Sequence, residues 1–519
     1  MSAETEPNEQ AVDLHPLIQQ RIANRQSLRD VGQDPYGSSE PGLMSLAAAT
    51  ARYDEAADED QKTNGKADGF VDKRPVVTVA GRVMLSRDNG KLIWLNLRDD
   101  SGDLQVAVSK RDCDEAGFAA AKLLDNADIV ITTGPLTKTK TGEVTVWAGT
   151  LRMASKSLVP PPEKWAGLQD VESRYRKRYV DLWANPEAMR VFQLRSKIVA
   201  GIRRLMDARG FIEVETPMLQ AQAGGAAARP FVTHMNALDI DLSMRIAPEL
   251  YLKRLLVGGM RRVYEINRNF RNEGVDKQHN PEFTAIEAYE AFGNYHSVME
   301  LSEAIVRHAA SIVSGSDENL TLPFGDLMID YAKPFARVTY AELFEKALGF
   351  PTSDVVRARE EAKKHRIKTA AEDGTPMDDV WIVNELFEEV AEKAIDPSVP
   401  TWVMDYPASL SPLTRPKADD PSIAERADLF VAGMEVGPHY TELNDPDIQL
   451  QRFQEQLAGI DDEESTFRTL DEDFVEALRV GMPPAGGMGL GIDRLVMLVT
   501  NSQTIRDVIL FPLLRPAEA

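Results

Sequence analysis

The chain has 519 residues, a formal net charge of −23 and a single cysteine, Cys113. This length exceeds what one compact core usually contains, so two or three domains are expected. One cysteine excludes a disulfide framework and a cysteine-rich metal site, and it fits a reducing compartment. The negative charge opposes approach to phosphates, which disfavours a nucleic-acid binder unless basic residues gather locally.

Signals for a membrane or for export are absent from the sequence. No apolar run approaches the roughly 18 residues that a membrane span needs, and the acidic start MSAETEPNEQ is unlike a signal or transit peptide. We therefore expect a cytoplasmic protein. Two local basic clusters, LTKTKTGE and SRYRKRY, are either solvated faces or contacts for a polyanion, and the residues alone leave both interpretations open.

Residues 1–73 predict a helix followed by an acidic, flexible segment. HPLIQQRIANRQSLRDVG places Leu17, Ile18, Ile22 and Leu28 at near-helical spacing, and DPYG ends the pattern. The following ATARYDEAADEDQKTNGKADG is acidic and poor in large apolar residues. We expect it to be a flexible surface connection with no functional centre.

Between residues 74 and 158 the apolar period becomes two, which indicates strands. The runs are VVTVAGRVMLSR, KLIWLNLRDD, DLQVAVSK, ADIVITTGPLTK and EVTVWAGTLRMAS. A helical stretch, DEAGFAAAKLLD, lies before the fourth run. This count matches a five-stranded Greek-key barrel of the oligonucleotide-binding (OB) type, although sandwiches with similar counts exist. Such a barrel could expose Trp94 for base stacking and Gln105 and Glu143 for base edges, whereas spacing alone favours Trp94 as a core aromatic.

After a proline-rich linker at 159–178, residues 179–519 are expected to form one large unit. FQLRSKIVAGIRRLMDARGF predicts a long amphipathic helix with Ile198, Ile202, Leu205 and Met206 as its apolar stripe, ended by Gly210. EVETPML then enters a strand.

Two further stretches of this unit predict an anion site. In FRNEGVDKQHNPEFT, strand-like runs on both sides indicate a hairpin with Arg271 at its root. In GGMGLGIDRLVML, three glycines alternate with apolar residues and leave one face of a strand bare. Arg494 follows at the start of a helix. Two arginines that converge on such a slot suit a triphosphate, and neither the P-loop nor the Rossmann pattern is present.

These stretches stand in the order of three known signature motifs. ARGFIEVETPML, FRNEGVDKQHNPEFTAIEAYEAF and GMGLGIDRLVML resemble motifs 1, 2 and 3 of the class II lysyl-tRNA synthetases, and GGAAARPFVTHMNALD and RIAPELYLKRLLVGG are typical of that branch. The resemblance runs from about Val76 to Pro516. It implies an α+β protein with an OB-type anticodon-binding barrel, and a class II catalytic domain whose antiparallel sheet is flanked by helices. A helical insertion at about 312–400 and a homodimer built through motif 1 are also implied.

The resemblance implies that lysine and ATP form lysyl-adenylate, and that lysine then passes to the 3′ end of lysine tRNA. Arg271 and Arg494 would be catalytic. The implied ATP-binding residues are Arg271, Glu273, His279, Phe283, Glu435, Gly491 and Arg494. Mg²⁺ would bridge the phosphates, held by Asp428 and Glu435. Asp428 is one methylene shorter than the family's usual glutamate.

The implied lysine-binding residues are Gly225, Glu249, Arg271, Glu287, Tyr289, Tyr440 and Glu442. Carboxylates that enclose a small ligand require a diamine, because unpaired buried carboxylates are costly. An acidic pocket therefore argues against the aspartyl and asparaginyl relatives. The implied anticodon-binding residues are Arg82, Trp94, Gln105 and Glu143, so the resemblance favours an exposed Trp94 over a core one.

Besides Asp428, three residues depart from the family pattern. Pro438 stands where asparagine usually helps to hold the substrate carboxylate, Tyr440 replaces a usual phenylalanine, and Met434 replaces a common arginine. Proline has no N–H to donate, so we expect either weaker lysine binding or an altered local loop. Two alternatives remain open: a paralogue that lysylates a protein, and a non-catalytic RNA-binding protein.

Overall fold

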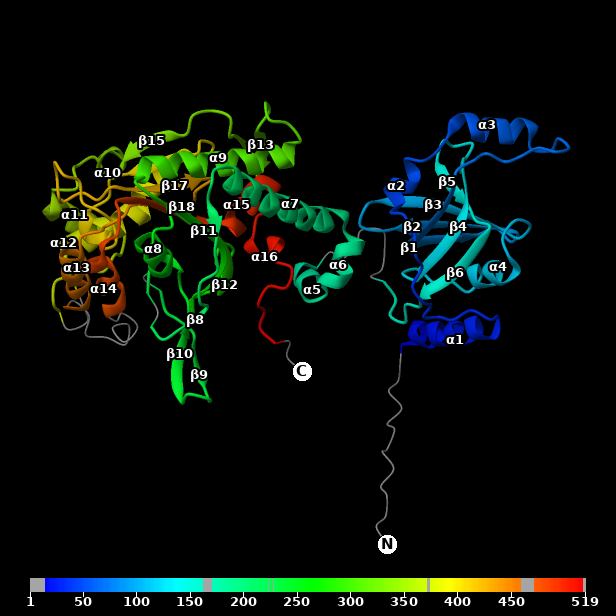
Figure 1. The fold of residues 1–519 in the computed structure, drawn as a ribbon, viewed down its shortest axis with the longest axis horizontal. Helices are drawn as coiled ribbons and strands as arrows, with labels where there is room; N and C mark the ends of the chain where they lie inside the picture. The colour runs from blue at the N-terminus through cyan, green and yellow to red at the C-terminus, as the bar shows by residue number, and fades with distance from the viewer. Residues whose placement is uncertain are drawn as a thin grey trace, which may run out of the picture. The chain divides into compact units, whose positions relative to one another are not determined.

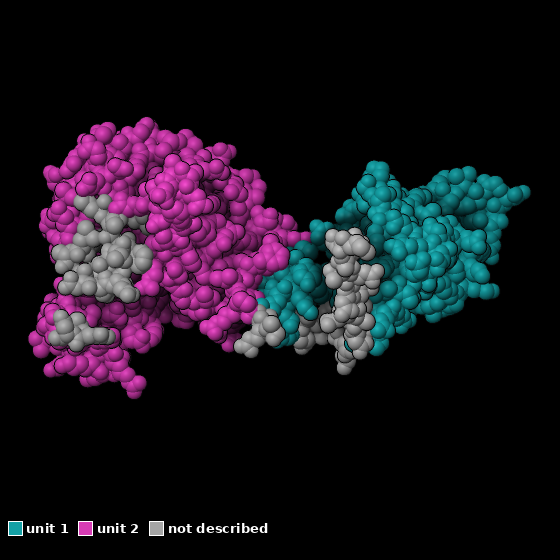
Figure 2. Space-filling model, turned by 90° about the horizontal axis from the view of Figure 1, so that it is seen from below, with its two compact units in different colours: residues 1–189 teal, residues 190–519 magenta. Residues whose placement is uncertain are grey.

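The computed structural model describes residues 15–161, 170–222, 224–226, 228–370, 374–458 and 471–516. The chain divides into two compact units, Met1–Met189 and Arg190–Ala519, which are coloured separately in Figure 2. Of the predicted linker, residues 162–169 lie outside the described residues. Its later part contains helix α5 (Val171–Arg176), and α6 (Arg178–Ala184) begins at its last residue.

Three helices precede the barrel in the first unit (Figure 1). The predicted N-terminal helix is confirmed as α1, Pro16–Asp30. The prediction of a flexible acidic segment is wrong, because α2 (Leu46–Thr50) and α3 (Glu55–Asn64) occupy it. Ser45 and Asp54 cap these helices by accepting backbone N–H bonds, which supplies the start signal that composition does not reveal.

The sheet of the first unit comprises β1 (Val76–Asp88), β2 (Leu92–Arg98), β3 (Asp103–Ser109), β4 (Ile129–Lys138), β5 (Val144–Trp147) and β6 (Thr150–Ser155), of which the first five form the barrel. Their order is β1-β2-β3-β5-β4-β6, and a pairing between β1 and β4 closes a ring of the first five. Helix α4, Glu115–Ala121, lies before β4 as predicted. The alternating residues of β1 and β2, among them Val79, Val83 and Leu95, fill the interior.

The fifth predicted strand is two strands in the structure. It breaks after Trp147 because β5 pairs with both β3 and β4, whereas β6 pairs only with β4. The chains cross closely at this point: a Cβ atom on Gly134 would lie 2.0 Å from the Trp147 carbonyl oxygen. Only glycine fits such a contact.

The second unit is built on an eight-stranded sheet. In spatial order its strands are β15 (Ala336–Thr339), β16 (Thr401–Met404), β17 (Arg426–Val431), β18 (Met434–Thr441), β19 (Ala485–Gly491), β12 (Glu282–Ala291), β11 (Arg262–Phe270) and β7 (Ile212–Glu213). The six inner strands are antiparallel, and only the two edge strands, β15 and β7, pair in parallel.

One face of this sheet is covered by α7 (Pro186–Ala208), α9 (Tyr295–Ser314) and α15 (Ile492–Thr500). Residues of β12 and β19 such as Ile286 and Met488 pack into this core. Since side chains alternate along a strand, the residues between them face the opposite side. That opposite face carries the predicted site.

The remaining elements surround the sheet (Figure 1). The strands are β8 (Leu219–Gln220), β9 (Val232–Met235), β10 (Ile240–Met244), β13 (Thr321–Phe324) and β14 (Leu327–Asp330). The helices are α8 (Glu249–Val257), α10 (Tyr340–Leu348), α11 (Val355–Lys364), α12 (Asp379–Leu386), η1 (Phe387–Ala391), η2 (Glu392–Ala394), η3 (Ala408–Leu410), α13 (Pro446–Ala458), α14 (Glu472–Gly481) and α16 (Ile505–Val508). The insertion expected to be helical at about 312–400 thus begins with strands and becomes helical from Tyr340 onward. None of the helices in the described ranges is long and apolar enough to cross a membrane.

Candidate active site and anticodon-binding surface

Strand register gathers the predicted site residues on the open face of the sheet. One row across the strands is Tyr289, Gly487, Tyr440 and Arg426. In the next row, Glu287 lies opposite Gly489 and Asp428 lies opposite Pro438. These residues are far apart in sequence, so only the sheet brings them together.

The glycines of β19 form the floor of this face. A Cβ atom on Gly487 would lie 1.9 Å from Oε1 of Glu442 and 2.5 Å from Cε1 of Tyr289. A side chain there would collide with both groups, so the expectation of a bare strand face is confirmed for Gly487. At Gly489 the nearest atom would be 3.8 Å away, on Pro438, which leaves space above the strand.

Arg271 stands at the base of the hairpin formed by β11 and β12, as predicted. Its backbone N–H donates to the carbonyl of Pro281 (2.8 Å) and closes the loop. Its guanidinium carbon lies 5.1 Å from the ring centroid of Phe283. Among the described residues its buried Nε has no hydrogen-bond partner. A stacked guanidinium with a free donor is suited to a phosphate or carboxylate.

Arg494 joins the third predicted motif to the loop of the second. Its Nη2 lies 3.0 Å from Nε2 of His279, and its Nη1 donates to the backbone carbonyl of Glu435. Nδ1 of His279 lies 2.8 Å from Oδ2 of Asp276. The structure therefore brings Arg271, Phe283, His279 and Arg494 to one end of the face. Glu273 is exposed on the loop, where its backbone N–H donates to the carbonyl of Arg271 at 2.9 Å.

Asp493, beside Arg494, anchors this helix start. Its Oδ2 accepts the backbone N–H of Thr284 at 2.7 Å, and its Oδ1 lies 2.5 Å from Nη1 of Arg195. Asp493 thereby ties α15 to β12 and α7. Gly491 begins the same turn, opposite Ala285 on β12. The sequence pattern marked a helix start at Arg494 and did not reveal this role of Asp493.

The other end of the face is built around a buried lysine that sequence reasoning missed. Lys253 is fully buried, its Nζ lies 2.7 Å from Oε1 of Glu249, and it also contacts Oε2 of Glu442. Glu249 and Lys253 stand one turn apart on α8. Their i, i+4 spacing in ELYLK was the sequence signal that could have found the pair.

Two carboxyl groups at this end, those of Glu287 and Glu442, have raised pKa values. Burial, followed by the charge of Glu249, raises the pKa of Glu287 to about 8, and Arg271 opposes the rise. Burial also raises the pKa of Glu442 to about 8, although Lys253 opposes it. Glu249 and Glu442 contact the one internal ammonium group, and Glu287 adds a third carboxylate under the influence of Glu249. A cationic ligand would relieve this excess of negative charge.

Gly225, Tyr289 and Tyr440 enclose the same end. Gly225 has φ +87°, and a Cβ atom there would lie 3.1 Å from Cβ of Glu249, so the backbone passes directly over the pocket. Tyr289 is buried, and its hydroxyl donates to Oε2 of Glu287 at 3.5 Å. Tyr440 is half-buried, with the guanidinium carbon of Arg426 5.9 Å from its ring centroid.

Asp428 is not open to a ligand in the way that Glu435 is. It is 2% exposed, and Arg426 donates to both of its oxygens, from Nε at 3.0 Å and from Nη2 at 2.6 Å. Glu435 is exposed on the face. Desolvation by the surrounding protein and the charge of Asp428 raise the pKa of Glu435, and Arg494 opposes them.

Glu392, which sequence reasoning missed, has a pKa raised to about 8 by burial and by Glu388 and Glu435.

These residues fit a cation that arrives with phosphates. In the described part of the chain, no group of three or more His, Cys, Asp or Glu side chains could hold a metal ion. Mg²⁺ commonly keeps several waters and uses one or two carboxylates together with substrate phosphates. Glu435 offers such a carboxylate beside Arg494, whereas Asp428 is already bound to Arg426.

A second candidate surface lies on the barrel of the first unit. Trp94, Gln105 and Glu143 line a cavity of ≈ 70 Å³. Nε2 of Gln105 donates to Oε2 of Glu143 at 2.8 Å, and Oγ1 of Thr145 donates to Oε1 of Gln105 at 2.9 Å. The indole of Trp94 is half-buried and lies edge-on to Trp147, with ring centroids 6.5 Å apart.

Arg82 does not join this group. Its Nη1 donates to the carbonyl of Ala127 at 2.8 Å, and its guanidinium carbon lies 5.0 Å from the ring of Trp183. Arg87, which faces Trp94 in the register of β1 and β2, lines the cavity in its place. The structure therefore does not bring Arg82, which the resemblance implied, to this cavity, and a bulge between Val83 and Leu85 shifts the register between Arg82 and Arg87.

Comparison with known proteins identifies the class. Residues 170–515 match the family of class II tRNA synthetases (D, K and N), and residues 77–154 match the OB-fold nucleic acid binding domain. The chain belongs to this class II family, and the predicted α+β fold with an OB-type barrel is confirmed.

The chain is similar over nearly its whole length to lysine–tRNA ligases. That of Pelotomaculum thermopropionicum is 45% identical over 512 residues, which cover 98% of this chain and 96% of the relative. That of Carboxydothermus hydrogenoformans is 42% identical over 511 residues, 98% of this chain and 99% of the relative. That of Cronobacter sakazakii is 48% identical over 449 residues, 85% and 87% of the two chains. The resemblance to the lysyl branch is confirmed.

Proposed function

We infer that the protein uses ATP to activate L-lysine as lysyl-adenylate and transfers the lysyl group to the 3′ end of lysine tRNA. The observation that carries this inference is the charge arrangement on one sheet face. Three carboxylates, opposed by one internal lysine, lie at one end of the face, and the guanidinium groups of Arg271 and Arg494 lie at the other. Full-length similarity to lysine–tRNA ligases supports the same activity.

In this proposal the nucleotide end binds ATP. Phe283 stacks on the adenine and Glu273 accepts a hydrogen bond from its amino group. Arg271 contacts the α-phosphate and the lysine carboxylate, while Arg494 and His279 hold the outer phosphates over Gly491. The pairing of Arg494 with His279 at 3.0 Å supports a shared role for these two. Fixed positive groups at the reacting phosphate lower the barrier without a covalent enzyme intermediate.

Magnesium, when bound, would neutralise charge on the phosphates. Glu435 would hold it. Asp428, whose two oxygens accept hydrogen bonds from Arg426, would add negative charge nearby. The protein must also align the lysine carboxylate with the α-phosphate. Arg271 performs this because one guanidinium can contact both groups.

The acidic end selects lysine. Glu249 binds the α-ammonium beneath Gly225, and Glu287, Tyr289 and Glu442 surround the side-chain ammonium, with Tyr440 against the aliphatic chain. When Glu287 and Glu442 are ionised, Lys253 neutralises one of the three carboxylates, and two negative charges are left for a ligand with two ammonium groups. An amino acid with an acidic or amide side chain would leave this charge uncompensated.

The expected partners follow from the same proposal. Trp94, Gln105, Glu143 and Arg82 are the anticodon contacts predicted from the sequence, and the first three lie together at one cavity. A homodimer through motif 1 is supported by exposed apolar side chains there, since Ile212 is 52% and Leu219 51% exposed. We expect the enzyme to work in the cytoplasm, where the lone thiol of Cys113 remains reduced.

The two alternatives have less support. A paralogue that lysylates a protein needs no anticodon barrel, and this chain has one. A non-catalytic RNA-binding protein need not keep Arg271, Glu435 and Arg494 at one end of a sheet face.

The decisive experiment is ATP–pyrophosphate exchange with purified protein and each amino acid in turn, followed by charging of a lysine tRNA transcript. We expect exchange with lysine, little with aspartate or asparagine, and lysine-dependent charging. Preferential exchange with aspartate would contradict the assignment. Lysine exchange without tRNA charging would favour the protein-modifying alternative.

A further inference from the structure

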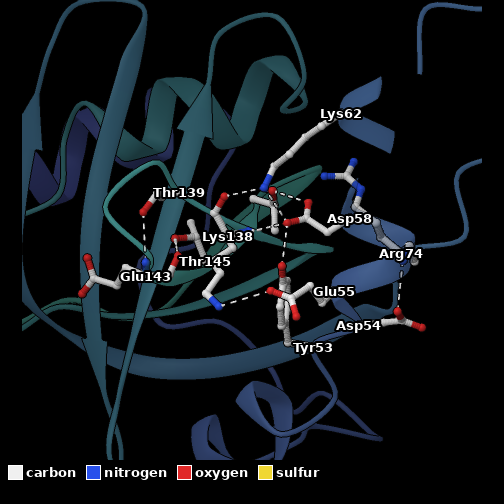
Figure 3. Close-up of polar contacts among 12 residues, drawn as sticks. Tyr53, Asp54, Glu55, Asp58, Lys62, Arg74, Lys138, Thr139, Glu143 and Thr145 are labelled. Atoms are coloured by element: carbon white, nitrogen blue, oxygen red, sulfur yellow. Dashed lines mark hydrogen bonds and ion pairs between the residues drawn. The ribbon is translucent and has the colours of Figure 1, made fainter. Parts of the chain in front are cut away.

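Helix α3 is fastened to the end of strand β4 by one buried carboxylate (Figure 3). Asp58 has 0% exposure and accepts four hydrogen bonds. Its donors are Oγ1 of Thr137 (2.7 Å), the backbone N–H of Lys138 (2.9 Å), Nζ of Lys62 (2.7 Å) and the hydroxyl of Tyr53 (2.9 Å). A carboxylate so fully bonded fixes the groups around it.

The carboxylate of Asp58 is held in its charged form. Burial alone would raise its pKa, but the bonds from Lys62, Thr137, the Lys138 amide and Tyr53 outweigh burial and hold that pKa below its ordinary value. Nζ of Lys62 also donates to the carbonyl of Lys138 at 2.8 Å. Both backbone groups of Lys138 are therefore bound by α3.

The side chain of Lys138 is engaged by the same helix segment. Its Nζ lies 3.8 Å from Oε1 of Glu55 and 5.5 Å from the ring centroid of Tyr53. The basic cluster that the sequence suggested as a contact for a polyanion is thus partly neutralised by the acidic segment. This observation points away from Lys138 as a phosphate contact and toward a structural task for α3 at this position.

Hydrogen bonds in the turn after Lys138 reach the cavity lined by Trp94, Gln105 and Glu143. The next residue, Thr139, closes the turn: its N–H donates to the Glu143 carbonyl (3.0 Å), and its Oγ1 accepts the N–H of Glu143 (3.2 Å). The Glu143 carboxylate then accepts the bond from Gln105 (2.8 Å). Thr139, the residue after Lys138, therefore positions Glu143 directly.

We propose that α3 positions the hairpin between β4 and β5 for anticodon recognition, with Asp58 as the positioning residue and Glu143 as the group it orients. Asp58 itself does not contact RNA. This inference rests on the proposed function, because it requires that the barrel reads the anticodon. It assigns a role to the acidic segment, whose composition alone indicated a flexible connection.

The test compares Asp58→Asn with Glu59→Gln in the full-length protein. Both remove one negative charge from α3, but Glu59 is exposed, so the second variant controls for charge. We expect Asp58→Asn to raise the KM for lysine tRNA about tenfold, within the range of coupling between neighbouring groups. Lysine-dependent ATP–pyrophosphate exchange should be unchanged in both variants, and Glu59→Gln should leave the KM for tRNA within about twofold.

A double variant separates positioning from general stability. If Asp58 acts through Glu143, then Asp58→Asn combined with Glu143→Gln should bind a lysine anticodon stem-loop no more weakly than Glu143→Gln alone. Independent, additive losses would overturn the proposal. Lys62→Met, which removes one donor from a side chain that is 48% exposed, serves if Asp58→Asn fails to fold, and it should raise the KM for tRNA in the same direction.

The outcomes distinguish this inference from the proposed function. An unchanged KM for tRNA in Asp58→Asn, with normal charging by the wild-type protein, would overturn the role of α3 alone. An absence of lysine-dependent exchange in the wild-type protein would overturn the proposed function and this inference with it.

Discussion

The two ends of the catalytic sheet face hold their charged groups in different ways. At the amino-acid end, Glu249, Lys253 and Glu442 are buried and contact one another. At the nucleotide end, His279 and Glu435 are exposed, and the Nε of Arg271 has no partner among the described residues. At the amino-acid end the charged groups are already paired with one another before a ligand binds. At the nucleotide end hydrogen-bond donors remain available for a ligand.

In the proposed function, the chemistry of the two ligands accounts for this difference. Lysine is small, so its recognition depends on desolvated charges whose positions are already fixed. ATP carries several negative charges and an associated cation, and it can organise exposed side chains around itself. Substitutions at the first end should therefore affect stability as well as binding, and those at the second end should affect catalysis alone.

The largest effect is expected from Lys253→Met. Removal of the ammonium leaves Glu249 and Glu442 buried without their cation, which should lower the free energy of unfolding by about 3–5 kcal/mol. Urea unfolding followed by circular dichroism measures the loss. The double variant Lys253→Met with Glu442→Gln should recover part of it, because one of the uncompensated carboxylates is gone.

Lys393 offers a matched control for this substitution. It also stands four residues after a glutamate, with Nζ 2.6 Å from Oε1 of Glu389, but both side chains are exposed. Lys393→Met should change the unfolding free energy by less than about 1 kcal/mol, as exposed pairs do. Equal losses in the two variants would show that burial does not distinguish Lys253.

The next largest effect is expected from Arg271→Ala. We expect kcat for lysine-dependent pyrophosphate exchange to fall by about 10²- to 10³-fold, the usual consequence of removing a donor aimed at developing charge. The unfolding free energy should change little, since the guanidinium contacts Phe283 but forms no ion pair in the described structure. Steady-state kinetics at saturating lysine and ATP give the measurement.

Arg268→Ala is the control at the same strand end. Arg268 lies on β11 and pairs with exposed Glu282 at 3.0 Å, away from the glycine floor. Its removal should leave kcat within about twofold. A loss comparable with that of Arg271→Ala would mean that exchange depends on the hairpin as a whole and not on the single guanidinium.

The pKa values of Glu287 and Glu442 predict that lysine affinity depends on pH. Both are raised to about 8 from an ordinary value near 4.5, so both carboxyl groups favour the protonated form at neutral pH in the free enzyme. A diammonium ligand binds the ionised form. The affinity for lysine should therefore increase between pH 6.5 and 7.5, by about tenfold for each proton released.

Isothermal titration in buffers of different ionisation enthalpy measures the protons released on lysine binding. Glu287→Gln should release fewer protons and flatten the pH profile. For stability the sign is opposite: a raised carboxyl pKa favours the folded state at low pH, so these groups make the free enzyme less stable as pH rises from about 4.5 to 8. Lysine binding without proton release would contradict the raised pKa values.

Features set by local pattern could be predicted from the sequence, and those set by register could not. The hairpin at Arg271 and the bare strand at Gly487 follow from alternation within a few residues. The cavity position of Arg87 depends on a bulge, and the attachment of helix α3 to β4 depends on one buried carboxylate, that of Asp58, which composition does not reveal. Lys253 matters only because α8 packs beside the strand end that carries Glu442.

The smallest effect, and the sharpest test of the amino-acid end, concerns Pro438. It lies opposite Asp428 in the register, with its Cδ 3.8 Å from the Cβ position of Gly489, so it stands on the site face. Asparagine there would add a side-chain donor for the lysine carboxylate. Since a hydrogen bond to a charged group contributes about 1.5 kcal/mol, Pro438→Asn should lower the KM for lysine about tenfold with little change in kcat.

Pro438→Ala distinguishes the missing side-chain donor from the missing backbone N–H. Alanine restores the backbone N–H but supplies no side-chain donor. If Pro438→Asn improves lysine binding and Pro438→Ala does not, the missing side-chain donor limits affinity. Equal improvement in both would assign the loss to the backbone of β18 instead. Improvement in neither would mean that Arg271 already satisfies the carboxylate, so that the nucleotide end, and not the preformed acidic end, sets this part of lysine recognition.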